Sequence, residues 1–413
     1  MTDLWTRLRG RARDFAPALT RSTPTAQSRW PGGRLARVLA AALLVAGTVT
    51  AFGLARALAA PAGCQNWTGA QPVNPGGLSN NFSSVAIESA CDAWAVGTQA
   101  GSGITATLTE HWNGSAWTVV PSPAPGTVSQ LRSVRGTSPT DVWAVGSYFD
   151  GAANMNKTLI LHWDGRVWTQ VTSPNPGSTD NELHGVRAVS ATDAWAVGYS
   201  VTGSTDKTLI MHWGGGTWTP VASPTPGTGA VLEAVAATSS TDAWAVGASF
   251  TASADKTLTL HWNGTKWAQV SSPNLGTDDE LFGVRGTSST DTWAVGVAVI
   301  SGVDKTLALH WNGTTWTRVP TPNPSGDPGS PPISNDLVGV AGSSASDTWA
   351  VGSSGTQTLI LHWDGSAWTV VPSPAPGANS QLFAVAASSA SNLWAVGESS
   401  DGTTDRTLAV HCC

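Results

Sequence analysis

The chain has 413 residues, of which 12% are charged, and it contains 22 Trp, 45 Gly and 25 Pro. This composition is typical of many short strands and tight turns, and it excludes a chain built mainly from amphipathic helices. Residues 64–413 carry 12 Lys and Arg against 25 Asp and Glu, which excludes the basic surface that a nucleic-acid partner requires.

The N-terminal segment predicts export. Residues 1–63 carry nine Arg against Asp3 and Asp14, and an apolar stretch runs from Val38 to Leu54. A basic region, an apolar stretch and small residues in this order predict a signal peptide cleaved after Ala59. The apolar stretch is at the short limit for a membrane span, so an uncleaved signal anchor is the alternative. We therefore predict a disordered basic region on the cytoplasmic side (1–37), a signal peptide or transmembrane signal-anchor helix (38–60), and an exported domain (64–413).

A repeat of about fifty residues fills the exported domain. The motif Asp-x-Trp-Ala-Val-Gly or a close variant occurs seven times, and a His-Trp pair with a further Trp follows six of these copies. Each repeat predicts four strands, which we call a (Leu-x-x-Val), b (Trp-Ala-Val-Gly), c (ending in His-Trp) and d (Trp-Thr-x-Val). Asn-Gly, Asp-Gly or Gly-Gly between c and d suits a two-residue hairpin. The pattern predicts an all-β fold, a seven-bladed β-propeller of four-stranded blades.

The two ends of the propeller domain are predicted to meet. The seventh repeat stops at His411 and lacks strand d, while Trp67 precedes Phe82 by fifteen residues, the strand d to strand a spacing of other repeats. The N-terminal strand should therefore complete the last blade beside the strand that ends at His411. This places cysteines close together, and export supplies oxidising conditions. We predict disulfides in which Cys64 joins Cys412 or Cys413, and Cys91 takes the other.

Loop lengths indicate a binding face. The spacing from strand-a Leu to strand-b Trp is always twelve, whereas the b–c loop and the d–a linker vary in length. These two loops share one face of an up-and-down blade, and binding faces tolerate variation. Residues there that break the repeat are our candidate ligand-binding residues: Tyr148, Phe149, Glu182, His184, Tyr199, Glu233, Phe250, Glu280, Phe282 and Phe383, with Asp150, Asp180, Asp278, Asp279 and Asp336 as further members.

Other polar residues recur at fixed positions of the repeat. Seven of the eight His share one position, which predicts a hydrogen-bonding role at a hairpin base, and we expect no metal site and no cofactor. The Asp before each Trp-Ala-Val-Gly is predicted to bond turn amides. Arg135, Arg187 and Arg285 share a strand-a position that Ala fills elsewhere. We expect these Arg to pair with neighbouring acids. The alternative resembles the arginine cluster with which sialidases hold a carboxylate, although two Tyr make the rest of that machinery scarce.

The repeat resembles the Trp-Ala-Val-Gly propeller repeats of secreted actinobacterial proteins, over residues 64–413, and is more distantly similar to kelch and Asp-box propellers. Kelch repeats carry a Gly-Gly pair in strand b, which is absent here. Asp-box repeats place their Asp, Gly and aromatic residue one position further apart than Asp364, Gly365 and Trp368. The resemblance therefore implies a fold and supplies no active site.

These features favour a binding scaffold over an enzyme. We expect a monomer, secreted or tethered to the outer face of the cytoplasmic membrane, that touches the membrane only through its N-terminal segment. It would recognise an extracellular glycan or protein through the variable b–c and d–a loop face. One alternative is a glycan-cleaving hydrolase or lyase on the same face, which could draw on Glu182, Asp279 and Glu280. Another is a purely structural envelope protein.

Overall fold

A computed structural model describes residues 67–77, 79–101, 103–324 and 332–412 of this chain. Every described residue belongs to one compact unit, Ala59–Cys413. The predicted regions 1–37 and 38–60 lie outside the described residues. In the described part, no helix has the length and apolar character needed to cross a membrane.

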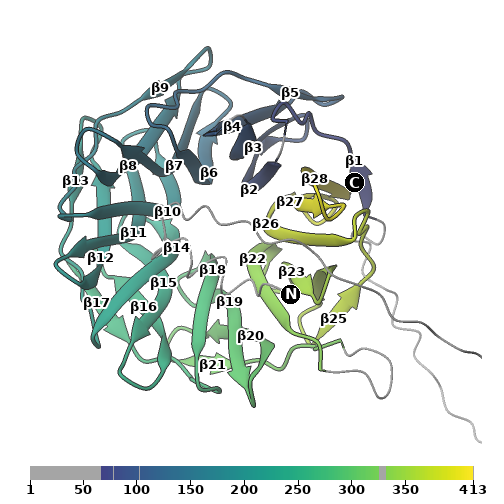
Figure 1. The fold of residues 1–413 in the computed structure, drawn as a ribbon. Helices are drawn as coiled ribbons and strands as arrows, with labels where there is room; N and C mark the ends of the chain where they lie inside the picture. Colours follow the sequence, from purple (N-terminus) through teal and green to yellow (C-terminus); the bar gives the residue numbers. More distant parts are fainter. Residues whose placement is uncertain (1–66, 78, 102, 325–331, 413) are drawn as a thin grey trace, which may run out of the picture. The chain divides into compact units, whose positions relative to one another are not determined.

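Each repeat forms its strands in the predicted order, with the first strand nearest the centre of the ring in Figure 1. The inner strands are β2 (Ser79–Ser89), β6 (Ser129–Ser138), β10 (Asp180–Ser190), β14 (Gly229–Ser239), β18 (Asp279–Ser288), β22 (Asn335–Ser344) and β26 (Asn379–Ser389). The second strands are β3 (Asp92–Gly101), β7 (Asp141–Asp150), β11 (Asp193–Thr202), β15 (Asp242–Phe250), β19 (Asp291–Ile300), β23 (Asp347–Ser354) and β27 (Asn392–Ser400).

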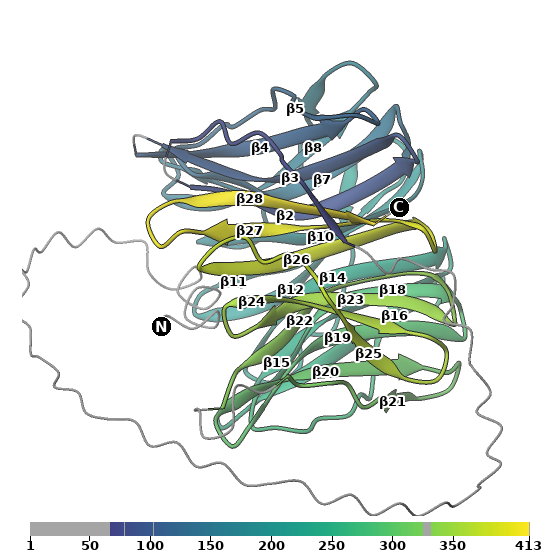
Figure 2. The same ribbon diagram turned by 90° about the vertical axis from the view of Figure 1, so that its right-hand side faces the viewer.

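Farther from the centre, the third strands are β4 (Ile104–Trp112), β8 (Met155–Trp163), β12 (Thr205–Trp213), β16 (Asp255–Trp262), β20 (Val303–Trp311), β24 (Gln357–Trp363) and β28 (Asp405–Cys412). The outer strands are short: β5 (Trp117–Val119), β9 (Trp168–Gln170), β13 (Trp218–Pro220), β17 (Trp267–Val270), β21 (Trp316–Arg318), β25 (Trp368–Val371) and β1 (Thr68–Ala70). Figure 2 shows the sheets from the side, stacked face to face around the ring.

Within the described residues these strands hydrogen-bond into six sheets. Five sheets have four antiparallel strands each: β6 to β9, β10 to β13, β14 to β17, β18 to β21 and β22 to β25. The sixth has eight strands, because the parallel pairing of Ser79 with Asp405 joins β2 to β28. The Ser79 hydroxyl donates to Asp405 Oδ2 at 3.1 Å. The chain is therefore an all-β propeller-like fold, with six hydrogen-bonded sheets where seven separate ones were predicted.

Tryptophan pairs connect neighbouring repeats. The Trp that begins an outer strand lies edge-on against the second-strand Trp of the preceding repeat. Trp168 and Trp94, for example, have ring centroids 5.1 Å apart at an interplanar angle of 85°. Such edge-to-face pairs contribute beyond the large apolar area that they bury. The contact recurs where the two ends of the repeat array meet, because Trp67 lies against Trp349 with centroids 5.7 Å apart at 70°.

The N-terminal strand closes the array as predicted. β1 pairs antiparallel with β28, with Thr68 opposite His411. The segment after β1 is also held, because the Val73 N–H donates to Glu110 Oε2 at 3.1 Å and the Thr407 N–H donates to Asn74 Oδ1 at 2.8 Å. The two ends of the propeller domain are thus joined by backbone pairing and by side-chain hydrogen bonds.

The cysteines differ from the prediction in one respect. Cys412 is disulfide-bonded, with its partner outside the described residues, and Cys64 and Cys413 also lie outside them. Cys91 is a free, exposed thiol, so the prediction that it forms a disulfide is wrong. Its side chain lies against Gly114 in the hairpin of its own repeat. Thr or Ser takes this place in the other repeats, so Cys91 fills a local packing position.

Candidate functional site

A β-bulge interrupts every inner strand at the same place. In β10, Leu183 lies opposite Gly198 and Gly185 lies opposite Val197, so His184 between them has no partner on β11. The glycine of Trp-Ala-Val-Gly makes room for this bulge, since a Cβ on Gly198 would lie 2.0 Å from the Glu182 carbonyl oxygen. Bulges redirect a side chain away from the regular sheet pattern. The glycine of the recurring Trp-Ala-Val-Gly motif therefore determines where the bulged residue lies, and the bulged residue differs from repeat to repeat.

The bulged residues form what we call the bulge ring, and each is partly exposed on an inner strand. The inner strands contact one another in a closed cycle from β2 through β26 and back to β2. In the first four repeats the bulged residue is polar or charged, and in the last three it is apolar. The bulge ring consists of Ser83, Arg132, His184, Glu233, Phe282, Val338 and Phe383.

Charged residues of three neighbouring repeats form one network in this ring. Arg132 Nη2 donates to Glu182 Oε2 at 3.0 Å, across the boundary between β6 and β10. The His184 imidazole lies between two carboxylates, with Nδ1 2.8 Å from Glu233 Oε2 and Nε2 3.4 Å from Glu182 Oε2. An imidazole can donate from both nitrogens only when it is protonated. The geometry therefore indicates an imidazolium between two anions.

Tyr199 and Asp180 extend the network along β10 and β11. The Tyr199 hydroxyl donates to Asp180 Oδ2 at 3.1 Å, and the Tyr199 ring lies edge-on to His184 with centroids 5.5 Å apart. Burial, with the nearby Glu182 charge, raises the pKa of Asp180 to about 6. Burial also raises the pKa of the Tyr199 hydroxyl, which therefore stays protonated and can donate.

The charges of this network hold one another in the ionised state. Burial opposes protonation of His184, but the charge of Glu233 and the hydrogen bonds to Glu182 and Glu233 together outweigh it and raise the imidazole pKa to about 9. Burial likewise opposes ionisation of Glu182, but Arg132 and His184 lower its pKa to about 2. His184 also keeps the pKa of Glu233 below its usual value despite burial. The cations Arg132 and His184 therefore balance the anions Glu182 and Glu233, and Asp180, with a pKa of about 6, adds a further negative charge at neutral pH.

The structure brings six of the ten candidate residues to the bulge ring or its network. Glu182, His184, Tyr199 and Glu233 belong to the charged network, and Phe282 and Phe383 occupy the apolar part of the ring. Arg132 was missed, although it occupies the same repeat position as His184 and Glu233. A position-by-position comparison of the inner strands would have found it.

The other four candidates lie away from the ring. Tyr148 packs against the apolar cluster between the first two repeats. Phe149 and Phe250 lie at the ends of β7 and β15, next to last and last, and their backbone groups bond the preceding linkers. Glu280 lies on β18 opposite Val297. Among the further members, Asp279 accepts the backbone N–H groups of Leu275 and Gly276 and so serves the linker.

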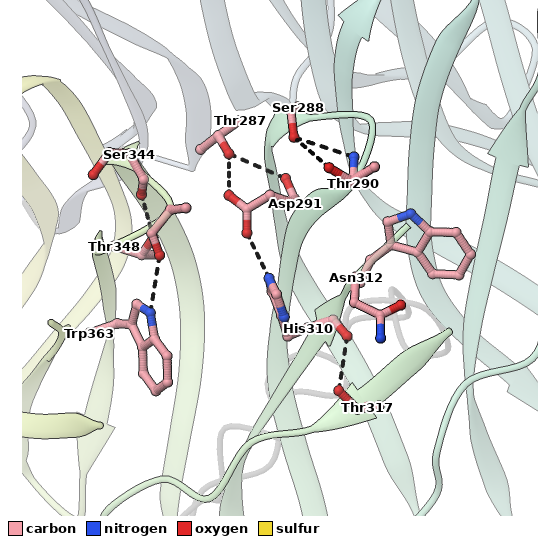
Figure 3. A network of polar contacts seen from close by, with 12 residues as sticks. Thr287, Ser288, Thr290, Asp291, His310, Asn312, Thr317, Ser344, Thr348 and Trp363 are labelled. Atoms are coloured by element: carbon pink, nitrogen blue, oxygen red, sulfur yellow. Dashed lines mark hydrogen bonds and ion pairs between the residues drawn. The ribbon is translucent and has the colours of Figure 1, made fainter. Parts of the chain in front are cut away.

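A second polar pattern recurs at the first residue of each second strand. Asp291 Oδ1 lies 2.6 Å from His310 Nε2, and the Thr287 hydroxyl donates to the other Asp291 oxygen (Figure 3). Equivalent His contacts occur throughout the described repeats, with Asn392 replacing Asp beside His411. The Asp residues thus bind imidazoles, not turn amides as predicted. A hydroxyl nucleophile must bond its imidazole base, and here the hydroxyl bonds the carboxylate, so the pattern is structural.

No family model matches the chain, and no curated protein matches its sequence. Its fold is similar to solved β-propeller structures. YCF48 bound to a D1 peptide has 15% sequence identity and a TM-score of 0.52, over 84% of this chain and 97% of that one. The WD40 propeller domain of Doa1 has 11% identity and a TM-score of 0.53, over 83% and 96%. The propeller domain of the Trilobed protease from Pyrococcus furiosus has 6% identity and a TM-score of 0.50, over 79% and 94%. At these identities the similarity shows the β-propeller fold alone.

Proposed function

We propose that this chain is an extracytoplasmic binding scaffold, a seven-bladed propeller whose bulge ring holds a segment of a protein partner. The observation that carries the proposal is the two-sided ring. Arg132, His184 and Glu233 offer charged and hydrogen-bonding groups on three consecutive repeats, and Phe282, Val338 and Phe383 offer apolar side chains on the next three. A peptide segment carries both kinds of group and can match both sides.

The build of the eight-stranded sheet supports the proposal of seven blades. β2 to β5 and β26 to β28 with β1 each repeat the four-stranded pairing of the other sheets, and a single residue pair joins the two sets. The seven inner strands also contact one another in a cycle. Counting the eight-stranded sheet as two blades therefore gives one blade for each sequence repeat.

The protonation states of Glu182 and Glu233 favour binding over glycan hydrolysis by this pair. A hydrolase with paired carboxylates needs one protonated acid beside one ionised carboxylate. Glu182 and Glu233 are both held as anions by Arg132 and His184. A peptide-bound structure also exists among the similar propellers, YCF48 with its D1 peptide, and this is a reason to test peptides first.

Export is the second part of the proposal. The basic region and apolar stretch before residue 60 have the form of a signal segment, and the disulfide at Cys412 suits an oxidising compartment. Cys91 provides a test because its thiol is free and exposed. A membrane-impermeant maleimide should label the chain on intact cells, or label chain found in the medium, and Cys91→Ser should lower the label. Labelling only after lysis would contradict export.

Binding can be tested with a phage-displayed library of random linear peptides panned on the full chain. Enriched peptides should bind Phe282→Ser and Glu233→Gln at least about tenfold more weakly than wild type. The first change removes an apolar side chain of the ring, and the second removes a charge from its polar part. Val167→Ser is the matched control, because Val167 is an apolar side chain 53% exposed in a hairpin outside the ring. Thermal unfolding of each variant would verify folding.

The result can also exclude the proposal. Peptides that bind all variants equally would place the site elsewhere. A glycan array and a glycosidase panel run on the same protein test two other functions, glycan binding and glycan hydrolysis. Glycan binding that Phe282→Ser abolishes, without peptide binding, would assign the ring to a glycan, and glycan turnover would make the chain a hydrolase.

A further inference from the structure

A second layer of charge lies along the inner strands. Arg135, Arg187 and Arg285 each follow a bulge-ring residue by three positions, about 10 Å along a strand. All three are partly buried. Among the described residues none of them forms an ion pair with a carboxylate. The expectation that they pair with neighbouring acids is therefore wrong.

The hydrogen bonds of these three residues leave donors unused. Arg135 Nη1 donates to the carbonyl oxygens of Val134 and Val85, and Arg285 donates to those of Gly286 and Gly342. Both arginines thus reach a neighbouring inner strand. The Arg187 side chain has no hydrogen-bond partner in the described part of the chain, and its buried Nε is unsatisfied. A guanidinium has five N–H donors, so most of the donors in this layer are free.

The three guanidinium groups are near enough to repel one another. Burial, together with the charges of Arg285 and Arg135, lowers the pKa of Arg187 to about 10. Burial and the charge of Arg285 likewise lower the pKa of Arg135 to about 10. Two carboxylates partly offset this charge. Asp291 acts on Arg285, and Glu88 acts on Arg135 and Arg187, but burial raises the pKa of Glu88 to about 7 despite Arg135. Near neutral pH the layer therefore keeps an excess of positive charge.

Unpaired cations in a partly buried position are costly unless an anion compensates them. Planar N–H forks match the oxygen pairs of carboxylates and phosphates. We propose that Arg135, Arg187 and Arg285 form a binding site for an oxyanion, supplied either as a free ion or as the carboxylate of a larger ligand. This site is separate from the peptide-binding role of the bulge ring, so either can fail without the other.

Thermal unfolding of the full chain tests this site. At constant ionic strength kept with chloride, the probes are inorganic phosphate, acetyl-trialanine and acetyl-trialanine amide. Saturating anion should raise the wild-type Tm by roughly 2 °C. A response to phosphate would assign a free ion. A response to acetyl-trialanine but not to its amide would assign the carboxylate of a larger ligand. No response to any probe would overturn the proposal.

Arg187→Gln separates a binding role from a structural one. Removing an unpaired cation should leave the Tm without anion unchanged or higher and should abolish the anion response. Arg166→Gln is the matched control, because Arg166 is exposed in a hairpin turn, and it should keep the full response. A lower Tm with an unchanged anion response would overturn the proposal. If Arg187→Gln does not fold, Arg135→Gln gives the same decision: loss of the response supports the site and its persistence overturns it.

Discussion

At the scale of single residues, His184 determines the chemistry of the candidate site. It contacts one carboxylate from its own strand and one from the next repeat. Its folded-state pKa of about 9 lies above the ordinary value of 6.5. A raised pKa means that protonated His184 stabilises the fold below about pH 6.5, and that this stabilisation is lost as the pH rises through about 9. The stability of the fold thus depends on the protonation of His184.

The first prediction concerns the variant His184→Gln. In urea unfolding it should be less stable than wild type by roughly 3 kcal/mol at pH 6, because Glu233 loses its partner. The gap should shrink by roughly 2 kcal/mol at pH 9.5, where wild-type His184 is mostly neutral. Val338→Ala, an uncharged change in the same ring, should show a gap that does not depend on pH. Equal gaps for His184→Gln at both pH values would contradict an imidazolium at this position.

At the scale of the strand pair, the motif glycine and the bulge require each other. In every repeat a Cβ on this glycine would lie between 1.9 and 2.2 Å from the carbonyl oxygen of the residue before strand-a Leu or Phe. The sequence shows that the glycine recurs, and the structure shows why. Without a side chain there, the inner strand can move over the second strand and gain one residue.

The second prediction is that Gly198→Ala destabilises the chain by about 3 kcal/mol, because the clash is with backbone atoms that no rotamer change can relieve. It should also weaken peptide binding, since it displaces Glu182 and His184. Gly214→Ala is the control, because nothing lies within 4 Å of its added Cβ. Guanidinium unfolding measures both variants. A loss below about 0.5 kcal/mol in Gly198→Ala would show that the bulge does not depend on glycine.

At the scale of the whole propeller domain, stability depends on closing the array. Trp67 is buried among residues of two repeats far from it in sequence, including Trp349 and Val410. Its place is equivalent to that of Trp168, which lies between the first and second repeats. A closed array should therefore respond to the loss of either Trp in the same way, although only Trp67 comes from the opposite chain end.

The third prediction compares Trp67→Ala with Trp168→Ala. Each should lower the free energy of unfolding by about 3–5 kcal/mol, through lost burial and the cavity left behind. Equal losses in guanidinium unfolding would support closure by the N-terminal strand. A loss near zero for Trp67→Ala beside a large loss for Trp168→Ala would indicate that the array stands open in solution.

The sequence alone determined the strands, the hairpins, the repeat period and the strand that closes the array. These features depend on local chemistry, such as Asn-Gly turns, and on a spacing that repeats within the chain. It also pointed to Glu182, His184, Tyr199 and Glu233 as residues that break the repeat. Only the tertiary structure decided that these four meet, and that Arg132 joins them from the preceding repeat. Contacts across a blade boundary join residues about fifty positions apart, and spacing alone cannot show which side chain a neighbouring strand will face. The same limit explains Cys91, which the sequence grouped with the other cysteines and which local packing leaves free.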